Sequence, residues 1–341
     1  MRVLLRRLMG VAVGGALAGC AGQHHPMNTL VTKSNLASWI YSLFVQVTFW
    51  DLLVLAIVVA ALALAIFWFS TRVGDPTEPA AFQSDTRLEL AWIIGPALIL
   101  LAITVPTVRT IIRTQPNRWP KNALTVKVIA HRWWWEFSYP QYHIQTADEL
   151  HLPVNREIHF ELTSADIIHS FWVPALGGKR DVIPGQVNQI TLIANTPGEY
   201  YGQCAEFCGL SHANMRFRVF VQTQDGFKKW MDHQLKPPVN PGSGPAAAGA
   251  AIYKNAPCAI CHQIRGVSGF SKQYTYGFRG PDLTHFGSRT TIAAGILDNN
   301  PKNLARWIAN PPEVKPGARM PALGVRGKEL DELVAYLESL K

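Results

Sequence analysis

Hydrophobic and polar positions follow three different patterns along this chain. Two early stretches are almost continuously apolar, short segments in the middle alternate apolar and polar residues, and the last stretch repeats apolar residues at helical spacing. Long apolar runs predict membrane-spanning helices, and the other two patterns predict strands and an amphipathic helix. The sequence therefore predicts a multidomain membrane protein with an all-β and an all-α domain.

The two apolar stretches predict spans at about 43–69 and 88–108, forming a transmembrane hairpin within an N-terminal segment, 21–115. Trp50 and Trp68 lie where interfacial aromatics are expected. Prolines inside the second stretch are tolerable in membrane helices. A pair of buried helices in a soluble protein is the alternative, and the length of the first run argues against it.

The first 20 residues have the features of a signal peptide. A basic start precedes a short apolar run and then Leu17-Ala18-Gly19-Cys20, which is similar to a bacterial lipoprotein box. We expect cleavage before Cys20 and lipidation of its thiol. Ordinary cleavage nearby, leaving Cys20 free, is the alternative.

Short β-branched segments bounded by turn residues fill the region 116–235. Strands are predicted at 125–130, 157–163, 188–194 and 216–221. Several such strands at short intervals predict a sandwich or a barrel.

Soft metal ligands are concentrated at the end of this β region. The stretch 200–215 contains, in order, Cys204, Glu206, Cys208, His212 and Met215. Thiolate, imidazole and thioether together suit copper, and two thiolates can bridge two copper ions. His169 is the nearest candidate for a second imidazole. A Cys204–Cys208 disulfide and a copper-delivery site are the alternatives, and neither requires the other ligands.

These residues resemble the dinuclear copper (CuA) site of subunit II of haem–copper cytochrome c oxidases. The resemblance implies a cupredoxin-like fold, with both cysteines bridging the coppers, His169 and His212 binding one copper each, and Met215 binding weakly. It further implies that the Glu206 carbonyl binds copper while its side chain binds a magnesium ion shared with subunit I. Asp166 and Asp181 are candidate supporting or interface residues.

Three consecutive tryptophans begin at Trp133. Because side chains alternate across a strand, at least one of the three should be exposed or lie at an interface. The family resemblance implies that Trp133 receives electrons from cytochrome c. Trp134 is a departure, since many family members have tyrosine there.

A Pro/Gly/Ala-rich linker, 236–250, is predicted to lead into a cytochrome c domain, 251–341. Cys258-Ala-Ile-Cys261-His262 is the signature of covalent haem c attachment. His262 supplies one axial ligand, and Met320 is the expected second one. His285 is the competing ligand, and a thioredoxin-like pair is the alternative for the cysteines. An amphipathic helix is predicted at 328–340.

The formal net charge is +9, from 32 Lys and Arg against 23 Asp and Glu. No basic run or nucleic-acid motif accompanies it, so we exclude nucleic acid and assign the charge to membrane flanks and partner surfaces. The five cysteines fall in three separate places, which is typical of cofactor attachment rather than of a disulfide framework.

Positive charges after the second apolar stretch would place the large domains in the cytoplasm by the positive-inside count. The signal peptide and the haem motif favour the opposite side, so we expect a multi-pass protein of the bacterial inner membrane with periplasmic copper and haem domains. Glu89 then lies at the inner end of the second span, where the resemblance implies the entrance of a proton path. A solvated helix-end carboxylate is the alternative.

The whole chain resembles caa3-type oxidase subunit II. This implies that an external donor, such as cytochrome c or a bc-type complex, reduces a fused haem c. The haem then passes electrons to CuA and on to subunit I, which reduces oxygen and pumps protons. Subunit III is a further expected partner. A nitric oxide reductase subunit with CuA and haem c is the alternative. A quinol oxidase subunit would lack the copper ligands, and nitrous oxide reductase would need a larger catalytic domain.

Overall fold

The computed structural model describes residues 26–68, 85–115, 122–269 and 279–341. The chain divides into two compact units. One comprises residues 1–37 and 116–341, and the other comprises residues 38–115. The predicted signal peptide and Cys20 lie outside the described residues.

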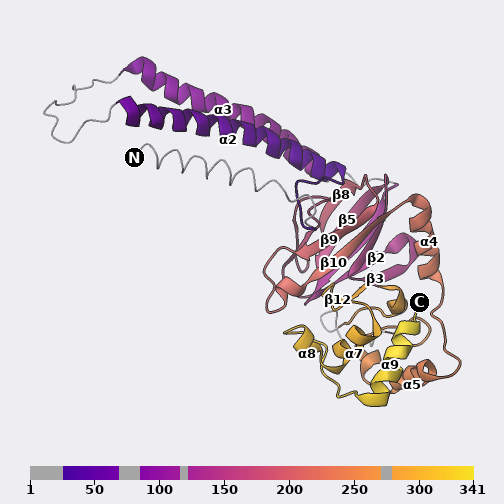
Figure 1. The fold of residues 1–341 in the computed structure, drawn as a ribbon. Helices are drawn as coiled ribbons and strands as arrows, with labels where there is room; N and C mark the ends of the chain where they lie inside the picture. The colour runs from indigo at the N-terminus through magenta and orange to yellow at the C-terminus, as the bar shows by residue number, and fades with distance from the viewer. Residues whose placement is uncertain (1–25, 69–84, 116–121, 270–278) are drawn as a thin grey trace, which may run out of the picture. The chain divides into compact units, whose positions relative to one another are not determined.

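Two long helices account for the apolar stretches (Figure 1): α2 (Asn35–Trp68) and α3 (Thr86–Thr114). Helix α2 begins eight residues before its predicted span, and α3 extends beyond its predicted span at both ends. Asp85 caps α3 by accepting a hydrogen bond from the Arg87 amide at 2.9 Å. Glu89 lies in the first turn of α3, and its predicted role in proton uptake stays a prediction.

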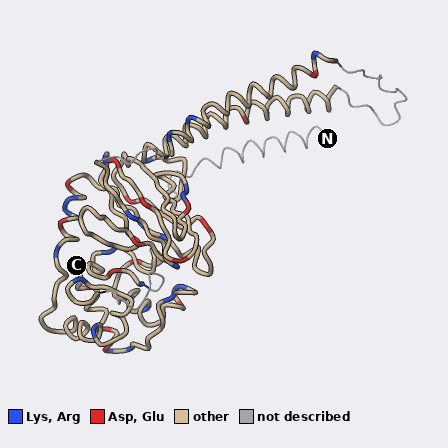
Figure 2. Tube along the Cα trace, turned by 180° about the vertical axis from the view of Figure 1, so that it is seen from behind, with Lys and Arg blue, Asp and Glu red and all other residues tan. Residues whose placement is uncertain are grey.

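Most apolar side chains of these helices are exposed in the described part of the chain, whereas Leu36 and Ala37 are buried. Leu52 and Ile93 are 59% and 61% exposed, and both helices are long and apolar enough to cross a membrane. Figure 2 shows few charged residues along them. An apolar surface of this extent is stable only in lipid or against partner helices.

The β domain is a sandwich of two five-stranded sheets with strand orders β3-β2-β1-β5-β8 and β4-β10-β9-β6-β7. The strands of the first sheet are β1 (Leu124–His131), β2 (Trp134–Tyr139), β3 (Ile144–Ala147), β5 (Glu157–Ser164) and β8 (Asn188–Ile193). Those of the second sheet are β4 (Glu149–Pro153), β6 (His169–Trp172), β7 (Arg180–Val182), β9 (Gly198–Cys204) and β10 (Arg216–Gln222). The pairs β1–β5 and β4–β10 are parallel, and the other pairs are antiparallel.

The alternation of apolar and polar residues along each strand predicts which side chains are buried in this core. Phe217, Val219 and Val221 of β10 are buried while the residues between them are partly exposed. An aromatic cluster fills the end of the core nearest the cysteines, where Trp135 lies edge-on to Phe171 at 5.7 Å between ring centroids. The predicted sandwich and its four quoted strands are therefore present.

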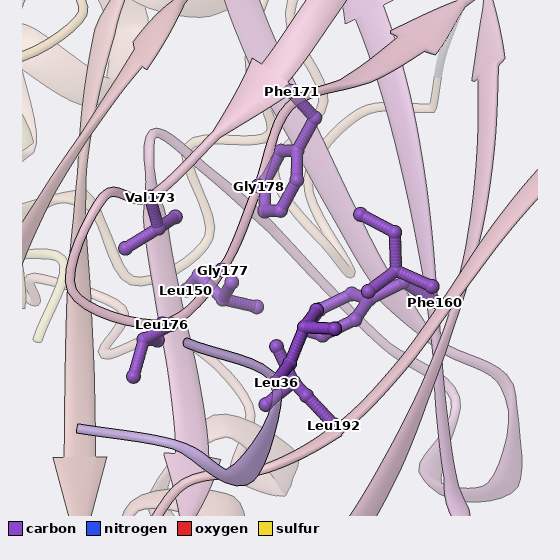
Figure 3. A pocket seen from close by; sticks show the side chains of 10 residues that line it. Leu36, Leu150, Phe160, Phe171, Val173, Leu176, Gly177, Gly178 and Leu192 are labelled. Carbon is purple, nitrogen blue, oxygen red and sulfur yellow. The ribbon is translucent and has the colours of Figure 1, made fainter. Parts of the chain in front are cut away.

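A small apolar cavity lies between the sheets and the first turn of α2. Figure 3 shows the side chains of Leu36, Phe160, Phe171 and Leu192 lining it. Leu36 is held there because Ser34 forms a β-bridge with Ala194. The first turn of α2 is thus part of the β-domain core.

The C-terminal domain is built from short helices and one small hairpin. Its elements are α5 (Pro245–Asn255), α6 (Cys258–Cys261), η4 (Phe286–Ser288), β11 (Thr291–Ile292), β12 (Leu297–Asp298), α7 (Pro301–Ala309), α8 (Pro311–Val314) and α9 (Gly327–Ser339). Helix α9 matches the predicted amphipathic helix and buries Leu333, Val334 and Leu337. Helix α5 packs on α9, and a Cβ at Gly249 would lie 1.9 Å from the Glu332 carbonyl oxygen.

The connection between the domains contains more helix than the predicted linker, 236–250, would have. Helix α4 (Gln224–Leu235) closes the β domain, with Thr223 accepting a hydrogen bond from the Gly226 amide at 3.1 Å. Helix α5 begins at Pro245, inside the predicted linker. The Ala-rich end of that segment has high helix propensity, and Pro245 is favourable at a helix N-terminus.

His151 makes the stability of the β domain sensitive to acid. Its ring stacks on Trp230 of α4 at 4.3 Å between centroids, and burial lowers its pKa to about 4. The unfolded chain binds this proton near pH 6.5, so the free energy of unfolding should fall by roughly 2 kcal/mol as the pH drops from 6.5 to 4. Denaturant unfolding across this range should show a shallower pH dependence in His151→Phe. The exposed His143→Asn is the control; an unchanged pH dependence in His151→Phe would refute the assignment.

Candidate metal centre and haem site

The two cysteines of the ligand stretch lie buried at the centre of a sulfur and nitrogen cluster. Their sulfurs are 3.8 Å apart. The Cys204 sulfur lies 3.8 Å from His169 Nδ1, and the Cys208 sulfur lies 3.5 Å from His212 Nδ1 and 3.8 Å from Met215 Sδ. Three different elements converge here: β6 carries His169, β9 ends at Cys204, and the turn before β10 carries the rest.

A hydrogen bond to a carboxylate fixes the orientation of the His169 imidazole. His169 Nε2 donates to Asp166 at 2.8 Å, leaving Nδ1 directed at the Cys204 sulfur. Burial opposes ionisation of Asp166, but hydrogen bonds from His169 and from the amides of Ile167 and Arg132 lower its pKa to about 2. A carboxylate behind a ligating histidine fixes the orientation of the ring. Asp166 is therefore a supporting residue, whereas Asp181 lies exposed on β7.

The close contact between the two thiols favours the release of their protons when a metal binds. The hydrogen bond from Cys208 is the largest influence on Cys204 and lowers its pKa to about 4. The pKa of Cys208 is correspondingly raised. A proton shared between two adjacent sulfurs is released when both become metal-bridging thiolates. His169 and both cysteines offer ligand atoms that all lie within 4.8 Å of one another.

The backbone carbonyl and the side-chain carboxylate of Glu206 lie in different surroundings. Its carbonyl oxygen lies 3.2 Å from the Cys204 sulfur, facing the cluster. The residue itself is exposed, so its carboxylate is not part of the buried cluster. Two thiols, two imidazoles, a thioether and a carbonyl make a donor set that fits a dinuclear copper centre.

The haem-attachment motif opens onto an apolar cavity in the C-terminal domain. Cys258, His262 and Met320 line it together with Leu283, Leu304 and Trp307. His262 Nδ1 donates to the Pro281 carbonyl at 2.7 Å, which leaves Nε2 free to bind a metal. A Cβ at Gly280 would lie 2.4 Å from the His262 ring, so this approach requires glycine. The cavity and its ligands fit a covalently attached haem c.

His285 occupies a different part of the C-terminal domain. Its Nε2 lies 3.2 Å and 3.1 Å from the carbonyl oxygens of Gln234 and Lys236. Its ring packs on His233, at 4.9 Å between centroids, rather than lining the cavity. The geometry therefore favours Met320 over His285 as the second axial ligand.

The three tryptophans are all buried in this unit, and two of them contact the C-terminal domain. Trp135 points into the sandwich core and is fully buried. Trp134 packs with Ala294, which precedes β12. Trp133 donates from Nε1 to the Cys208 carbonyl at 2.8 Å, and Lys315 Nζ donates to the Trp133 carbonyl. The interface expected from the alternation argument is thus formed within the chain itself.

Sequence reasoning missed a set of buried charges where the two domains meet. Lys315 and Asp148 are both buried, and the Glu149 carboxylate accepts hydrogen bonds from Thr290 Oγ1 at 2.6 Å and the Thr290 amide at 2.7 Å. Arg319, next to Met320, lies 4.0 Å from Asp166. No local pattern marks these residues, because their burial depends on contacts between distant segments.

Comparison with known proteins matches both domains. Residues 143–222 match the family described as "Cytochrome C oxidase subunit II, periplasmic domain", and residues 246–341 match the family described as "Cytochrome c". The second match begins at the start of α5. The copper ligands lie in or beside the first match, and the haem-attachment motif lies in the second.

Relatives extend this similarity over nearly the whole chain. Cytochrome c oxidase subunit 2 of Alkalihalophilus pseudofirmus is 34% identical over 95% of this chain and 94% of its own length. The protein of the same name from Bacillus sp. is 37% identical over 80% of each chain. The solved periplasmic domain of cytochrome oxidase subunit II of Bradyrhizobium japonicum is 34% identical, covering 34% of this chain and 95% of that one, with a TM-score of 0.33.

Proposed function

Because the chain belongs to the cytochrome c oxidase subunit II family and carries a fused cytochrome c domain, we propose that it carries electrons from haem c through CuA to subunit I of a proton-pumping caa3-type oxidase. The fused domain makes the first transfer intramolecular. Fusion replaces a diffusive encounter by a high effective concentration of donor. The oxygen-reducing site belongs to subunit I.

The ligand cluster is the observation that carries this proposal. Cys204 and Cys208 would hold the dicopper centre, and their sulfurs lie close to both imidazoles and to the Met215 thioether. A bound dicopper centre supplies one-electron chemistry. The chain's own contribution is to hold these ligands rigidly on β6, β9 and the turn before β10, and to exclude water by burying both sulfurs.

The C-terminal domain supplies the second redox site. Cys258 and Cys261 would attach haem c, and His262 and Met320 would bind its iron. A thioether ligand raises the reduction potential of a haem relative to a second histidine. The apolar lining of the cavity acts in the same direction, since it disfavours the additional positive charge of ferric iron.

Membrane and partner assignments follow from the family. The chain is membrane-anchored and carries the family's periplasmic domain. We place it in a bacterial inner membrane beside subunits I and III, with cytochrome c or a bc-type complex as donor. Glu89 is proposed at the entrance of a proton path, and the Glu206 side chain at a magnesium site shared with subunit I. The relatives' names favour oxygen over nitric oxide as the acceptor.

Electron paramagnetic resonance of the copper-loaded full-length protein tests the proposal. We expect hyperfine structure from one unpaired electron shared by two equivalent coppers, together with a separate low-spin ferric haem signal. Reduction of the haem by a brief photochemical pulse should then be followed by haem reoxidation as copper is reduced. A mononuclear copper signal, or a Cys204–Cys208 disulfide that persists in the isolated protein, would instead support the copper-delivery alternative.

A further inference from the structure

The indole of Trp133 is held between the two domains by two glycines. On one side, a Cβ at Gly209, in the copper-ligand loop, would lie 3.2 Å from Trp133 Cζ2. On the other side, a Cβ at Gly317, three residues before Met320, would lie 3.1 Å from Trp133 Cη2 and 3.0 Å from Leu210 Cβ. Both glycines have positive φ, +106° and +85°. A Cβ at either position would be closer to the ring than ordinary van der Waals contact, so both backbones lie close to the indole.

Three hydrogen bonds fix the segment 315–320 in this position. The Lys315 ammonium donates to the Trp133 carbonyl at 2.5 Å and to the Ala293 carbonyl at 3.3 Å. Ser211, next to the copper ligand His212, donates to the Pro316 carbonyl. The segment that ends at the haem ligand is therefore anchored to the loop that carries the copper ligands.

The charges around this anchor are complementary and shielded from water. Lys315 is only 4% exposed, and Asp148, beside it in the interface, is 8% exposed. Burial lowers the pKa of Lys315 to about 8, and the attraction of Asp148 opposes that shift. A buried ammonium without an opposite charge would be strongly unfavourable, so this pair favours one docked arrangement of the two domains.

We propose that Lys315 and Gly317 are positioning residues that dock the Met320 segment on Trp133, the residue at which the family resemblance already places electron entry. This inference rests on the proposed function and adds to it the residues that maintain the contact between the haem-ligand segment and the indole. It also implies that an external donor reacts with the C-terminal domain, because Trp133, 9% exposed, is already covered.

The step transfers one electron and changes no bond. Ferrous haem c becomes ferric while the oxidised dicopper centre gains one electron. The path runs from the Met320 segment through the Gly317–Trp133 contact to the Cys208 carbonyl, which accepts a hydrogen bond from the indole at 2.8 Å. The external one-electron donor then restores ferrous haem.

The test is the rate of copper reduction after pulsed photoreduction of haem c in the assembled oxidase. Gly317→Ala should slow this intramolecular step by roughly tenfold, because small misplacements of reacting groups reduce rates steeply. Lys315→Met should slow it as well. Both variants should retain wild-type copper and haem spectra and unchanged bimolecular reduction of the haem by an external donor. That combination separates a positioning role from general destabilisation.

Gly324→Ala is the matched control. Gly324 also has positive φ, +74°, and lies four residues after Met320, but nothing lies within 4 Å of its Cβ position. Lys302→Met, on an exposed part of α7, controls for loss of charge. Wild-type rates in both Gly317→Ala and Lys315→Met would overturn the inference. If Gly317→Ala does not fold, Lys315→Met alone decides. Absence of transfer in the wild-type protein would refute the proposed function instead.

Discussion

Replacing Cys208 by serine is expected to abolish the dinuclear copper centre. The Cys208 sulfur is the most connected atom of the cluster, lying 3.8 Å from the Cys204 sulfur, 3.5 Å from His212 Nδ1 and 3.8 Å from Met215 Sδ. Serine preserves the shape of the side chain but offers a hard oxygen in place of a soft thiolate. Copper affinity should therefore fall by more than the roughly 100-fold typical of losing a residue that supports a ligand.

Copper titration and electron paramagnetic resonance of the full-length variant measure this effect. We expect mononuclear copper or none, an unchanged haem spectrum, and no electron transfer from haem to copper. Asp166→Asn is the comparison, since it leaves every candidate copper ligand in place and changes the hydrogen-bond partner of His169. It should keep the dinuclear signal while weakening copper binding by about 10- to 100-fold. A dinuclear signal in Cys208→Ser would contradict the assignment of the bridging ligands.

Gly249→Ala should cause the largest loss of stability in the C-terminal domain. In an exposed helix this substitution would stabilise the protein by about 1 kcal/mol. Here the added Cβ would lie 1.9 Å from the Glu332 carbonyl oxygen and 2.8 Å from Tyr336 Cβ, so α5 and α9 must separate. Forced separation of packed backbones costs about 3 kcal/mol. Because α9 lines the haem cavity with Leu333 and Leu337, the haem environment should change too.

Denaturant unfolding followed by haem absorbance measures the effect, and the yield of covalently attached haem provides a second readout. Gly242→Ala is the matched control, because nothing lies within 4 Å of its Cβ position. The control should unfold at the wild-type denaturant concentration. Equal midpoints for Gly249→Ala and wild type would mean that the two helices do not pack as closely as the structure indicates.

The metal ligands were predictable because the stretch 200–215 carries five of them within a short distance along the chain. Only His169 had to be found at a distance. The haem motif is similarly local. The four quoted strands follow from alternation, which reports directly on which side of a sheet is buried. Metal ligation, haem attachment and burial of one face of a strand all depend here mainly on residues that are near one another in sequence.

The features that escaped prediction depend on contacts between distant segments. Trp133 lies in the turn before β2 and Trp134 begins β2, and both are buried against the C-terminal domain. The burial of Lys315 reflects a contact with a carbonyl 182 residues earlier. The start of α5 was missed for another reason: Pro and Gly suggested a linker, whereas the alanines that follow favour helix. Hydrophobic patterns within one segment contain no information about domain docking.

The bridge between Ser34 and Ala194 makes the membrane anchor an insertion within the β domain rather than an appendage to it. Ser34 Oγ donates to the Leu176 carbonyl at 2.5 Å, and the Asn35 side chain accepts from the Ile193 amide at 2.8 Å, so the sandwich is completed by residues synthesised well before its strands. Closing so long a loop slows assembly. A soluble fragment that begins after α3 lacks Leu36, and the apolar surface that Leu36 covers, including Gly177, is then open to water or to association with another copy.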